Sequence, residues 1–273
     1  MFEAFLTPWF AAYLALGVVV GFLAGLLGIG GGMTMVPILT MLFAAQDFPF
    51  ETKMQVILAT SMATIMLTAS SSVRAHHSRG AVDWQTVALM SPGILLGSLV
   101  GTRLLASFST LFLGVFFTGF LFYTATQMLL NFKPKPSRHL PGAWGLTLAG
   151  FTVGVLSALV GAGGGFFSVP FLTWANVPMH TAVGTSAALG LPIAVFTTIG
   201  NIWNGWGHAQ VPQPSLGFVY LPALVGICVT SVLLAPIGAR LAHRLPVLTL
   251  KRLFAALLYL LGAKMLHTVW TGA

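Results

Sequence analysis

Hydrophobic residues run along most of this chain in continuous stretches, without the strict alternation that marks a half-buried strand. Short polar loops separate ten apolar segments, of which most hold about 20 residues, the length that spans a bilayer as a helix. The segments cover about 9–29, 33–45, 54–72, 86–106, 110–130, 142–161, 165–177, 181–203, 216–237 and 249–270. Backbone groups in hydrocarbon must find partners within the chain, so these segments predict helices. We therefore expect an all-α polytopic membrane protein.

One stretch of the sequence occurs twice. Residues 21–40 read GFLAGLLGIGGGMTMVPILT and residues 154–173 read GVLSALVGAGGGFFSVPFLT, with eleven identities among twenty positions. The repeat continues with ATS at 59–61 against GTS at 184–186, and GTRL at 101–104 against GARL at 238–241. The chain therefore divides into a first repeat over 1–131, a basic, proline-rich linker over 132–141 and a second repeat over 142–273. Each repeat holds about five apolar segments.

Basic residues occupy different loops in the two repeats. The loop VRAHHSRG at 73–80 is basic, whereas the matching loop of the second repeat, WNGWGHAQVPQPS, has no Lys or Arg. The second repeat instead gathers its basic residues in ARLAHRLPVLTLKR. Short loops rich in Lys and Arg lie on the cytoplasmic side. The alternation favours inverted repeats with both termini outside over parallel repeats, which would carry basic residues in matching loops.

Composition narrows the function. The chain is 57% hydrophobic and 6% charged, whereas about 25% of the residues in a soluble domain are charged. The net charge of +8 comes mostly from loops that set membrane orientation, so nucleic acid is not an expected partner. The chain has four carboxylates, which lie in loops or at the terminus: Glu3, Asp47, Glu51 and Asp83. Cation transporters normally place carboxylates within the membrane, so this distribution favours an anion.

The two glycine blocks, Gly30 to Gly32 and Gly163 to Gly165, interrupt apolar runs. The segments that follow, 33–45 and 165–177, reach about 20 Å, short of a hydrocarbon core of about 30 Å. The sequence leaves open whether they cross the membrane. A short helix that begins at such glycines presents free N–H groups and a positive partial charge to an anion. In transporters, broken helices of inverted repeats hold the substrate near the midplane. Close helix packing at small residues is the alternative.

Hydroxyl side chains follow each glycine block. Thr60-Ser61 and Thr185-Ser186 are expected to open the helices after the short segments and to complete an anion cradle, unless they bond their own helix carbonyls. The candidate substrate-binding residues are Gly30, Gly31, Gly32, Thr34, Thr60, Ser61, Gly163, Gly164, Gly165, Ser168, Thr185 and Ser186.

A second group of polar residues suggests a gate. Arg74, His76 and His77 end a helix, and either histidine is a proton handle near neutral pH. The repeat register matches His76 with Asn201, which together with nearby tryptophans marks an outer vestibule. Lys and Arg that extend to the interface and interfacial Trp anchors are the structural alternatives. Catalytic, phosphate-binding and metal-binding spacings do not occur in the sequence, so neither an enzyme nor a cofactor or metal site is expected.

The paired glycine–proline blocks, the ATS and GTS that follow them, and RGAVDW at 79–84 together resemble the TauE/SafE family of membrane permeases. The resemblance covers nearly the whole chain. It implies a bacterial inner-membrane transporter of small anions, often sulfur-containing ones such as sulfite or sulfoacetate, frequently as export. Matched position by position, the resemblance implies that the glycine blocks and the Thr–Ser pairs of this sequence are functional residues.

The sequence therefore predicts a secondary-active, multi-pass transporter of the bacterial inner membrane, with export as the expected direction. Its partners are a small anion, sulfite or an organosulfonate, and the lipid bilayer, and a homodimer is left open. A channel for a small neutral solute is the alternative, since half-helices in inverted repeats serve there too. A membrane-embedded scaffold would leave the repeated glycine blocks unexplained. The coupling ion is not specified.

Overall fold

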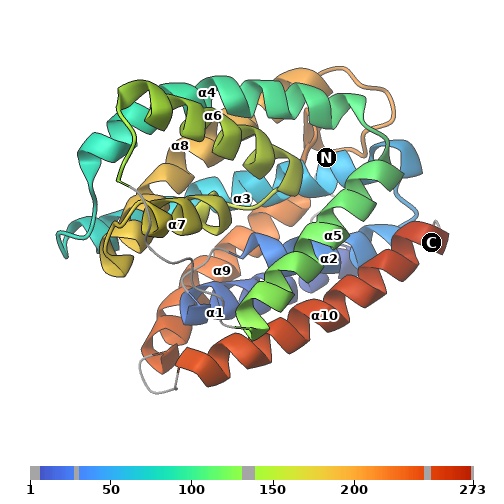
Figure 1. Ribbon diagram of the computed structural model, residues 1–273. Coiled ribbons are helices and arrows are strands. Elements are labelled where there is room, and N and C mark those ends of the chain that lie inside the picture. The colour runs from blue at the N-terminus through green and yellow to red at the C-terminus, as the bar shows by residue number, and fades with distance from the viewer. Residues whose placement is uncertain (1–6, 28–30, 131–138, 243–246, 272–273) are drawn as a thin grey trace.

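The computed structural model describes residues 7–27, 31–130, 139–242 and 247–271. Ten α-helices dominate these residues, which confirms the all-α class (Figure 1). The helices are α1 (Pro8–Leu27), α2 (Gly32–Ala44), α3 (Lys53–His77), α4 (Trp84–Ser107), α5 (Thr110–Leu129), α6 (Ala143–Val160), α7 (Gly165–Trp174), α8 (Met179–Gly205), α9 (Leu221–Ala242) and α10 (Val247–Thr271). A 3-10 turn (Phe50–Thr52) precedes α3, and a short antiparallel hairpin of β1 (Ser215–Leu216) and β2 (Val219–Tyr220) precedes α9.

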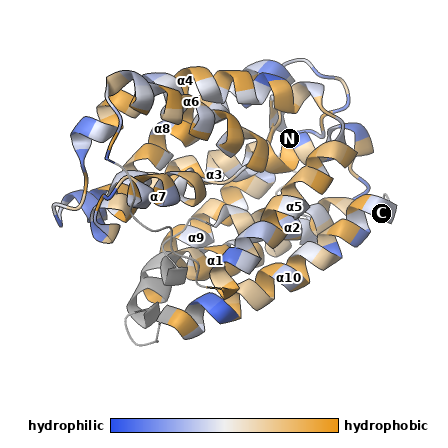
Figure 2. Cartoon of the chain, in the orientation of Figure 1, coloured by the Kyte–Doolittle hydropathy of each residue, from blue (hydrophilic) through white to orange (hydrophobic). Residues whose placement is uncertain are grey.

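Six of these helices are long and apolar enough to cross a membrane. The stretches are Phe50–Arg74, Trp84–Ser107, Thr110–Leu129, Ala143–Val160, Met179–Gly205 and Lys251–Thr271. Figure 2 shows apolar residues along the helices, while hydrophilic residues concentrate toward the loops. Large apolar side chains such as Leu148 and Leu260 are about two-thirds exposed on the outside of the bundle, as a lipid-facing surface requires. The chain is therefore a multi-pass membrane protein.

Two short helices turn back inside the bundle. The Tyr13 hydroxyl of α1 donates a hydrogen bond to Gln46 Oε1 at 2.9 Å, so the end of α2 lies beside the first part of α1. Similarly, α7 returns along α8, where Ser168 Oγ lies 2.9 Å from Ser186 Oγ. With 13 and 10 residues, α2 and α7 extend about 20 Å and 15 Å, too short to cross about 30 Å of hydrocarbon.

Helices α3 and α8 run antiparallel through the middle of the molecule (Figure 1). At one end of α3, Thr52 Oγ1 donates to the carbonyl oxygen of Gln210 at 2.7 Å, just past the end of α8. At the other end, the backbone N–H of Asp83 donates to Thr185 Oγ1 at 2.9 Å, near the start of α8. The end of each helix therefore lies beside the start of the other.

Two hydrophobic cores flank this central pair. One core joins α1, α2, α5, α9 and α10 with the first part of α3. The other core joins α4, α6 and α8 with the second part of α3. Among the described residues, helices from the two sequence halves therefore pack together in shared cores.

The packing of the two halves is reciprocal. A Cβ atom added to Gly17 of α1 would lie 2.5 Å from the carbonyl oxygen of Ile227 of α9. A Cβ atom added to Gly150 of α6 would clash with the carbonyl oxygen of Met90 of α4. Gly17 and Gly150 are matching positions of the repeat, and so are Met90 and Ile227. The sequence repeat is thus reproduced at these close helix contacts. The inversion of one half relative to the other stays a prediction that the antiparallel course of α3 and α8 favours.

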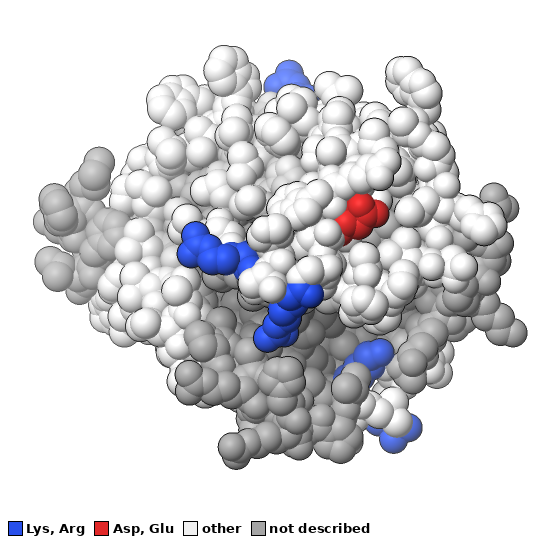
Figure 3. Space-filling view, turned by 90° about the vertical axis from the view of Figure 1, so that its left-hand side faces the viewer, with Lys and Arg blue, Asp and Glu red and all other residues white. Residues whose placement is uncertain are grey.

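Basic residues gather at one end of the molecule, which we call the basic end. It holds Arg74 and Arg79 at the end of α3, and Lys251 and Arg252 at the start of α10. Figure 3 views this end, where Lys and Arg outnumber acidic residues. The described chain begins and ends at the opposite end, because α1 starts beside the start of α9 and α10 runs antiparallel to α5.

Candidate functional site

Both glycine blocks start a short helix at the matching position of the repeat. The α2 helix begins at Gly32 after the N-cap Gly31, and α7 begins at Gly165 after the N-cap Gly164. The two N-cap residues share the same right-handed backbone conformation. The predicted glycine-started helices are therefore present. Gly30 lies outside the described residues.

The two breaks meet beside the midpoint of α3. A Cβ atom added to Gly32 would lie 2.8 Å from the carbonyl oxygen of Gly161, which precedes the second block. Ile65, at the centre of α3, is the nearest neighbour of Gly163, at 3.4 Å from an added Cβ. Ser61 Oγ donates to the Gly161 carbonyl at 2.8 Å and fixes the junction. Segments about 130 residues apart in the chain are thus in contact at mid-depth of the bundle.

Gly161 explains how the second break is made. It ends α6 with a φ of +62°, a left-handed conformation that side chains other than glycine rarely adopt. Its N–H still donates to the Ser157 carbonyl at 3.0 Å, so the helix ends without losing that bond. The chain then reverses within three residues and begins α7. Glycine is required here for backbone geometry as well as for close packing.

The two helix N-termini differ in what surrounds them. The N-terminus of α2 is filled, because an added Cβ on Gly31 would meet Val20 and one on Gly32 would meet the Gly161 backbone. At α7, an added Cβ on Gly165 would meet no described atom within 4 Å. Ser157 Oγ lies 3.6 Å from the Cβ position of Gly164. An added Cβ on Gly164 would meet the Ile193 side chain much as one on Gly31 would meet Val20. The two N-termini therefore differ at the first helical residue, where Gly165 has open space and Gly32 does not.

Thr60 and Thr185 lie about two turns inside α3 and α8, so the prediction that they open these helices is wrong. The helices start earlier because the 3-10 turn before α3 and Pro178 before α8 set their first residues. Thr60 Oγ1 accepts a hydrogen bond from the Tyr220 N–H at 3.0 Å, and Thr185 accepts the equivalent bond from Asp83. Each threonine therefore fixes the segment that leads into a helix of the other half.

The serines lie closer to the breaks. Ser168 Oγ is 2.7 Å from the Gly164 carbonyl oxygen and 2.9 Å from Ser186 Oγ, and both side chains are buried. In the first half, Thr34 Oγ1 donates to the Gly31 carbonyl at 3.0 Å. The glycines and these hydroxyls are therefore brought together by the fold, while Thr60 and Thr185 bond outward to the neighbouring half.

The predicted gate residues of α3 lie at the basic end. The Nε1 group of Trp84 donates to His77 Nδ1 at 3.1 Å. Burial, and next the nearby charge of Arg79, lower the pKa of His76 below its usual 6.5. His76 is therefore mostly neutral at pH 7, and Arg74 beside it is exposed.

Asn201 does not join this group. It lies near the far end of α8, toward the end of the molecule opposite the basic loops. Its side chain is fully buried, whereas Trp203 and Trp206 on the same stretch are 81% and 69% exposed. The tryptophans have the exposure of interfacial anchors, and Asn201 lies inside the bundle rather than in an open vestibule.

Sequence reasoning missed four buried polar side chains and named a fifth, Asn201, only as a gate residue. The buried side-chain atoms that find no hydrogen-bond partner among the described residues belong to Ser98, Ser157, Thr197, Thr198 and Asn201. An unsatisfied buried polar group costs about 1–3 kcal/mol, so such a group needs an explanation. The signal in the sequence was the spacing of Thr197 and Asn201, which puts two polar residues on one face of an apolar helix.

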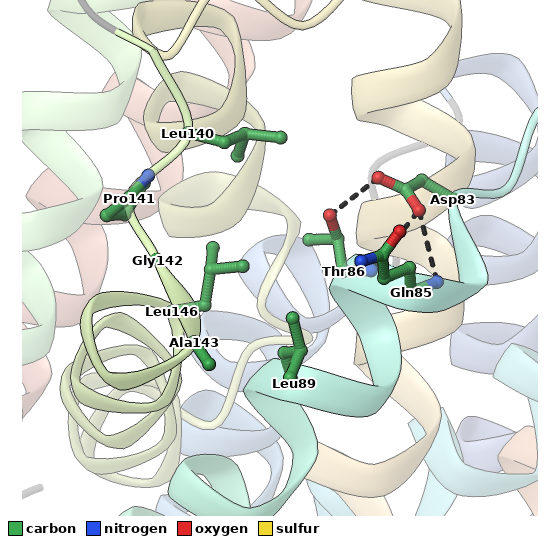
Figure 4. Close-up of a pocket in the computed structure, with 9 residues that line it drawn as sticks. All are labelled: Asp83, Gln85, Thr86, Leu89, Leu140, Pro141, Gly142, Ala143 and Leu146. Atoms are coloured by element: carbon green, nitrogen blue, oxygen red, sulfur yellow. Dashed lines mark hydrogen bonds between the residues drawn. The ribbon is translucent and has the colours of Figure 1, made fainter.

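A surface pocket at the basic end is a separate feature (Figure 4). Its volume is about 440 Å³, and it lies between the starts of α4 and α6. Its carboxylate, Asp83, accepts hydrogen bonds from the N–H groups of Gln85 and Thr86 and from Thr86 Oγ1. Because these bonds cap α4, the carboxylate serves the helix rather than a ligand.

Comparison with known proteins places this arrangement among membrane transporters. A probable membrane transporter protein of Haemophilus influenzae is 36% identical, over 92% of this chain and 96% of the relative. A protein of the same description from Methanocaldococcus jannaschii is 24% identical over 92% of both chains. The probable membrane transporter protein YunE of Bacillus subtilis is 25% identical over 77% of this chain and 85% of its own length. No solved structure matches the chain significantly.

The model of the family described as sulfite exporter TauE/SafE matches residues 13–265, which include part or all of each of the ten helices. The family description and the names of the relatives indicate a membrane transporter rather than an enzyme. The chain belongs to the sulfite exporter TauE/SafE family.

Proposed function

We propose that this protein is a secondary-active transporter that exports a small anion, sulfite or an organosulfonate such as sulfoacetate, across the bacterial inner membrane. The observation that carries the proposal is the meeting of two glycine-started helices beside the midpoint of α3. A helix N-terminus presents unpaired N–H groups and a positive partial charge, which suit an anion. Glycine lets the ligand approach the backbone closely.

The distribution of charge supports an anion over a cation. The described carboxylates, Asp47, Glu51 and Asp83, lie in loops or beside helix ends rather than at the breaks. The second half has none. Among the described residues, no group of three His, Cys, Asp or Glu side chains is placed to hold a metal ion. The centre of the molecule therefore offers an incoming ion N–H groups and hydroxyls, which are hydrogen-bond donors.

The packing supports alternating access by movement of one body against the other. Helices α1 and α9 are in close backbone contact through one core, and α4 and α6 are in close contact through the other. A rocking motion of these bodies around the two breaks would expose the site first to one side and then to the other. Since Lys and Arg mark the cytoplasmic side, the basic end faces the cytoplasm and both termini lie outside.

Flux measurements on the purified full chain in proteoliposomes test the proposal. We expect saturable efflux of ³⁵S-sulfite that sulfoacetate inhibits. The variant Gly165→Leu should fold, because open space surrounds this position, and should lose at least tenfold in flux because it fills the N-terminus of α7. Gly119→Leu on α5 is the matched control, since an added Cβ there also meets no described atom.

The result that would overturn the proposal is equally specific. A wild-type protein that moves neither sulfite nor sulfonates, or that passes water or glycerol without competition by anions, is not an anion transporter. The second outcome is the one that a channel for neutral solutes predicts.

A further inference from the structure

The unpaired polar side chains near the second break are unlike other hydroxyls in the same helices. Ser91 of α4 and Thr152 of α6 donate to the carbonyl four residues earlier, at 2.7 Å and 3.1 Å. Serine and threonine hydroxyls in membrane helices commonly donate to the carbonyl oxygen four residues earlier. Ser98 and Ser157, on the same two helices, are fully buried and find no partner among the described residues. Their hydroxyls are therefore available to something else.

Contacts place Ser157 and Thr197 at the N-terminus of α7. Ser157 Oγ is 3.6 Å from the Cβ position of Gly164, and the side chains of Val153 and Ile193 contact the same glycine. Thr197 lies one turn beyond Ile193 on α8, just as Ser157 lies one turn beyond Val153 on α6. Two unpaired hydroxyls from different helices thus lie on the faces that enclose the start of α7.

The register between α4 and its neighbours adds Ser98 to the same level. The backbone nitrogen of Ser98 is 2.9 Å from the Cβ position of Gly154, one turn before Ser157 on α6. Gly200 of α8 packs directly against Thr102, which lies one turn after Ser98. Since α4 and α8 run in the same direction, Ser98 lies about level with Thr197.

Asn201 extends this group one turn further along α8, away from the basic end. Both its amide nitrogen and its amide oxygen are unpaired among the described residues, and the side chain is fully buried. An amide and three hydroxyls supply neutral hydrogen-bond donors. Such donors fit a ligand with several acceptor oxygens.

We infer that Ser98, Ser157, Thr197 and Asn201 form an oxyanion subsite that continues from the N-terminus of α7 between α4, α6 and α8. The inference rests on the proposed anion transport and names the side chains that recognise the substrate. The ligand is a small oxyanion, whose oxygens accept from the α7 N–H groups and from these side chains together. The subsite leads from mid-depth toward the end opposite the basic loops.

The matching positions of the repeat do not carry the same set of donors. The repeat matches Ser157 with Ala24 and Asn201 with His76, so the hydroxyl and the amide are replaced by a methyl group and an imidazole. Three of the four subsite side chains, on α6 and α8, therefore come from the second half, and Ser98 on α4 comes from the first half.

Binding of sulfite by Asn201→Leu, Ser157→Ala and the isosteric Thr197→Val tests the inference. Each variant removes a donor to a charged ligand, so we expect the half-saturating sulfite concentration to rise about tenfold or more. The rise in melting temperature that sulfite causes in the wild type should be lost, while the ligand-free variants melt at the wild-type temperature or above. Asn204→Leu and Ser91→Ala are matched controls, which should keep both readouts.

The outcomes separate this inference from the proposed function. If Gly165→Leu blocks flux while all three variants keep the half-saturating concentration within twofold, the subsite is refuted and anion transport stands. If the wild type carries no oxyanion, both proposals fail. A variant that keeps the sulfite-induced rise in melting temperature also contradicts the subsite, whatever its flux.

Discussion

The helices α2 and α7 begin at matching glycines of the repeat, yet their surroundings differ. Most of α2 is buried, and it packs between α10, α3 and α1. In α7 only Ser168 and Leu172 are fully buried among its residues, and its main neighbour is α8. The repeated sequence therefore sets where each chain break falls, while the neighbouring helices decide whether its N-terminus is filled or free. A transporter with alternating access needs such a difference between its two halves at any moment.

The largest effect should come from a bulky side chain at either N-cap. Leucine at Gly164 would occupy the start of α7, where the anion is proposed to bind, and leucine at Gly31 would disturb the filled start of α2 where the two breaks meet. The first neighbours are the Val20 and Ile193 side chains, which shift more easily than backbone. We expect each variant to insert into the membrane and to lose sulfite flux in proteoliposomes. Normal flux in either variant would show that the N-terminus of the corresponding helix is not part of the transport site.

A single methyl group should distinguish the two helices by stability. Gly32→Ala places a Cβ 2.8 Å from the Gly161 carbonyl oxygen, and this overpacking costs about 1–3 kcal/mol. Gly165→Ala enters open space and should change the free energy of unfolding by less than about 0.5 kcal/mol. Thermal unfolding of the purified proteins in one detergent measures both. Equal melting temperatures for Gly32→Ala and Gly165→Ala would show that these two positions do not differ in how tightly they are packed.

The serines at the two breaks sharpen the comparison further. Ser61→Ala removes the only side-chain donor described for the buried Gly161 carbonyl, at an expected cost of about 1–2 kcal/mol. Ser186→Ala should cost less, about 0.5 kcal/mol, because the Ser168 hydroxyl keeps its bond to the Gly164 carbonyl. Thermal unfolding in the same detergent measures which of the two variants loses more stability. The reverse order would contradict the assignment of Ser61 as the group that holds the junction.

The smallest effect should come from His76, which is remote from both breaks. Burial and Arg79 lower its folded pKa below 6.5, so the unfolded chain binds the proton more tightly. Stability is therefore unaffected well above pH 6.5 and falls as the pH drops from 6.5 toward the lowered pKa. His76→Ala should remove this slope from melting curves recorded between pH 5 and 8. If flux keeps the wild-type pH dependence in this variant, His76 is not the proton carrier.

The positions of the breaks were accessible from sequence because they depend on local chemistry. Glycine runs inside apolar segments favour a break in the helix, and both α2 and α7 begin within one residue of the expected position. The buried location of Asn201 was not accessible, because an amide near helix-end tryptophans fits an exposed vestibule equally well. The bonds of Thr60 and Thr185 to the opposite half were also hidden, since their partners lie 160 and 102 residues away in the chain.

The sequence by itself determined the ten apolar segments, the membrane environment and the two glycine-started helices, since hydropathy and glycine act within a few residues. Only the tertiary structure decided which N-terminus stays open and where Ser98, Ser157, Thr197 and Asn201 lie relative to it. Those features depend on contacts between helices from different halves of the chain. A repeated sequence specifies the same local bends twice, but it does not require that the same neighbours pack against each.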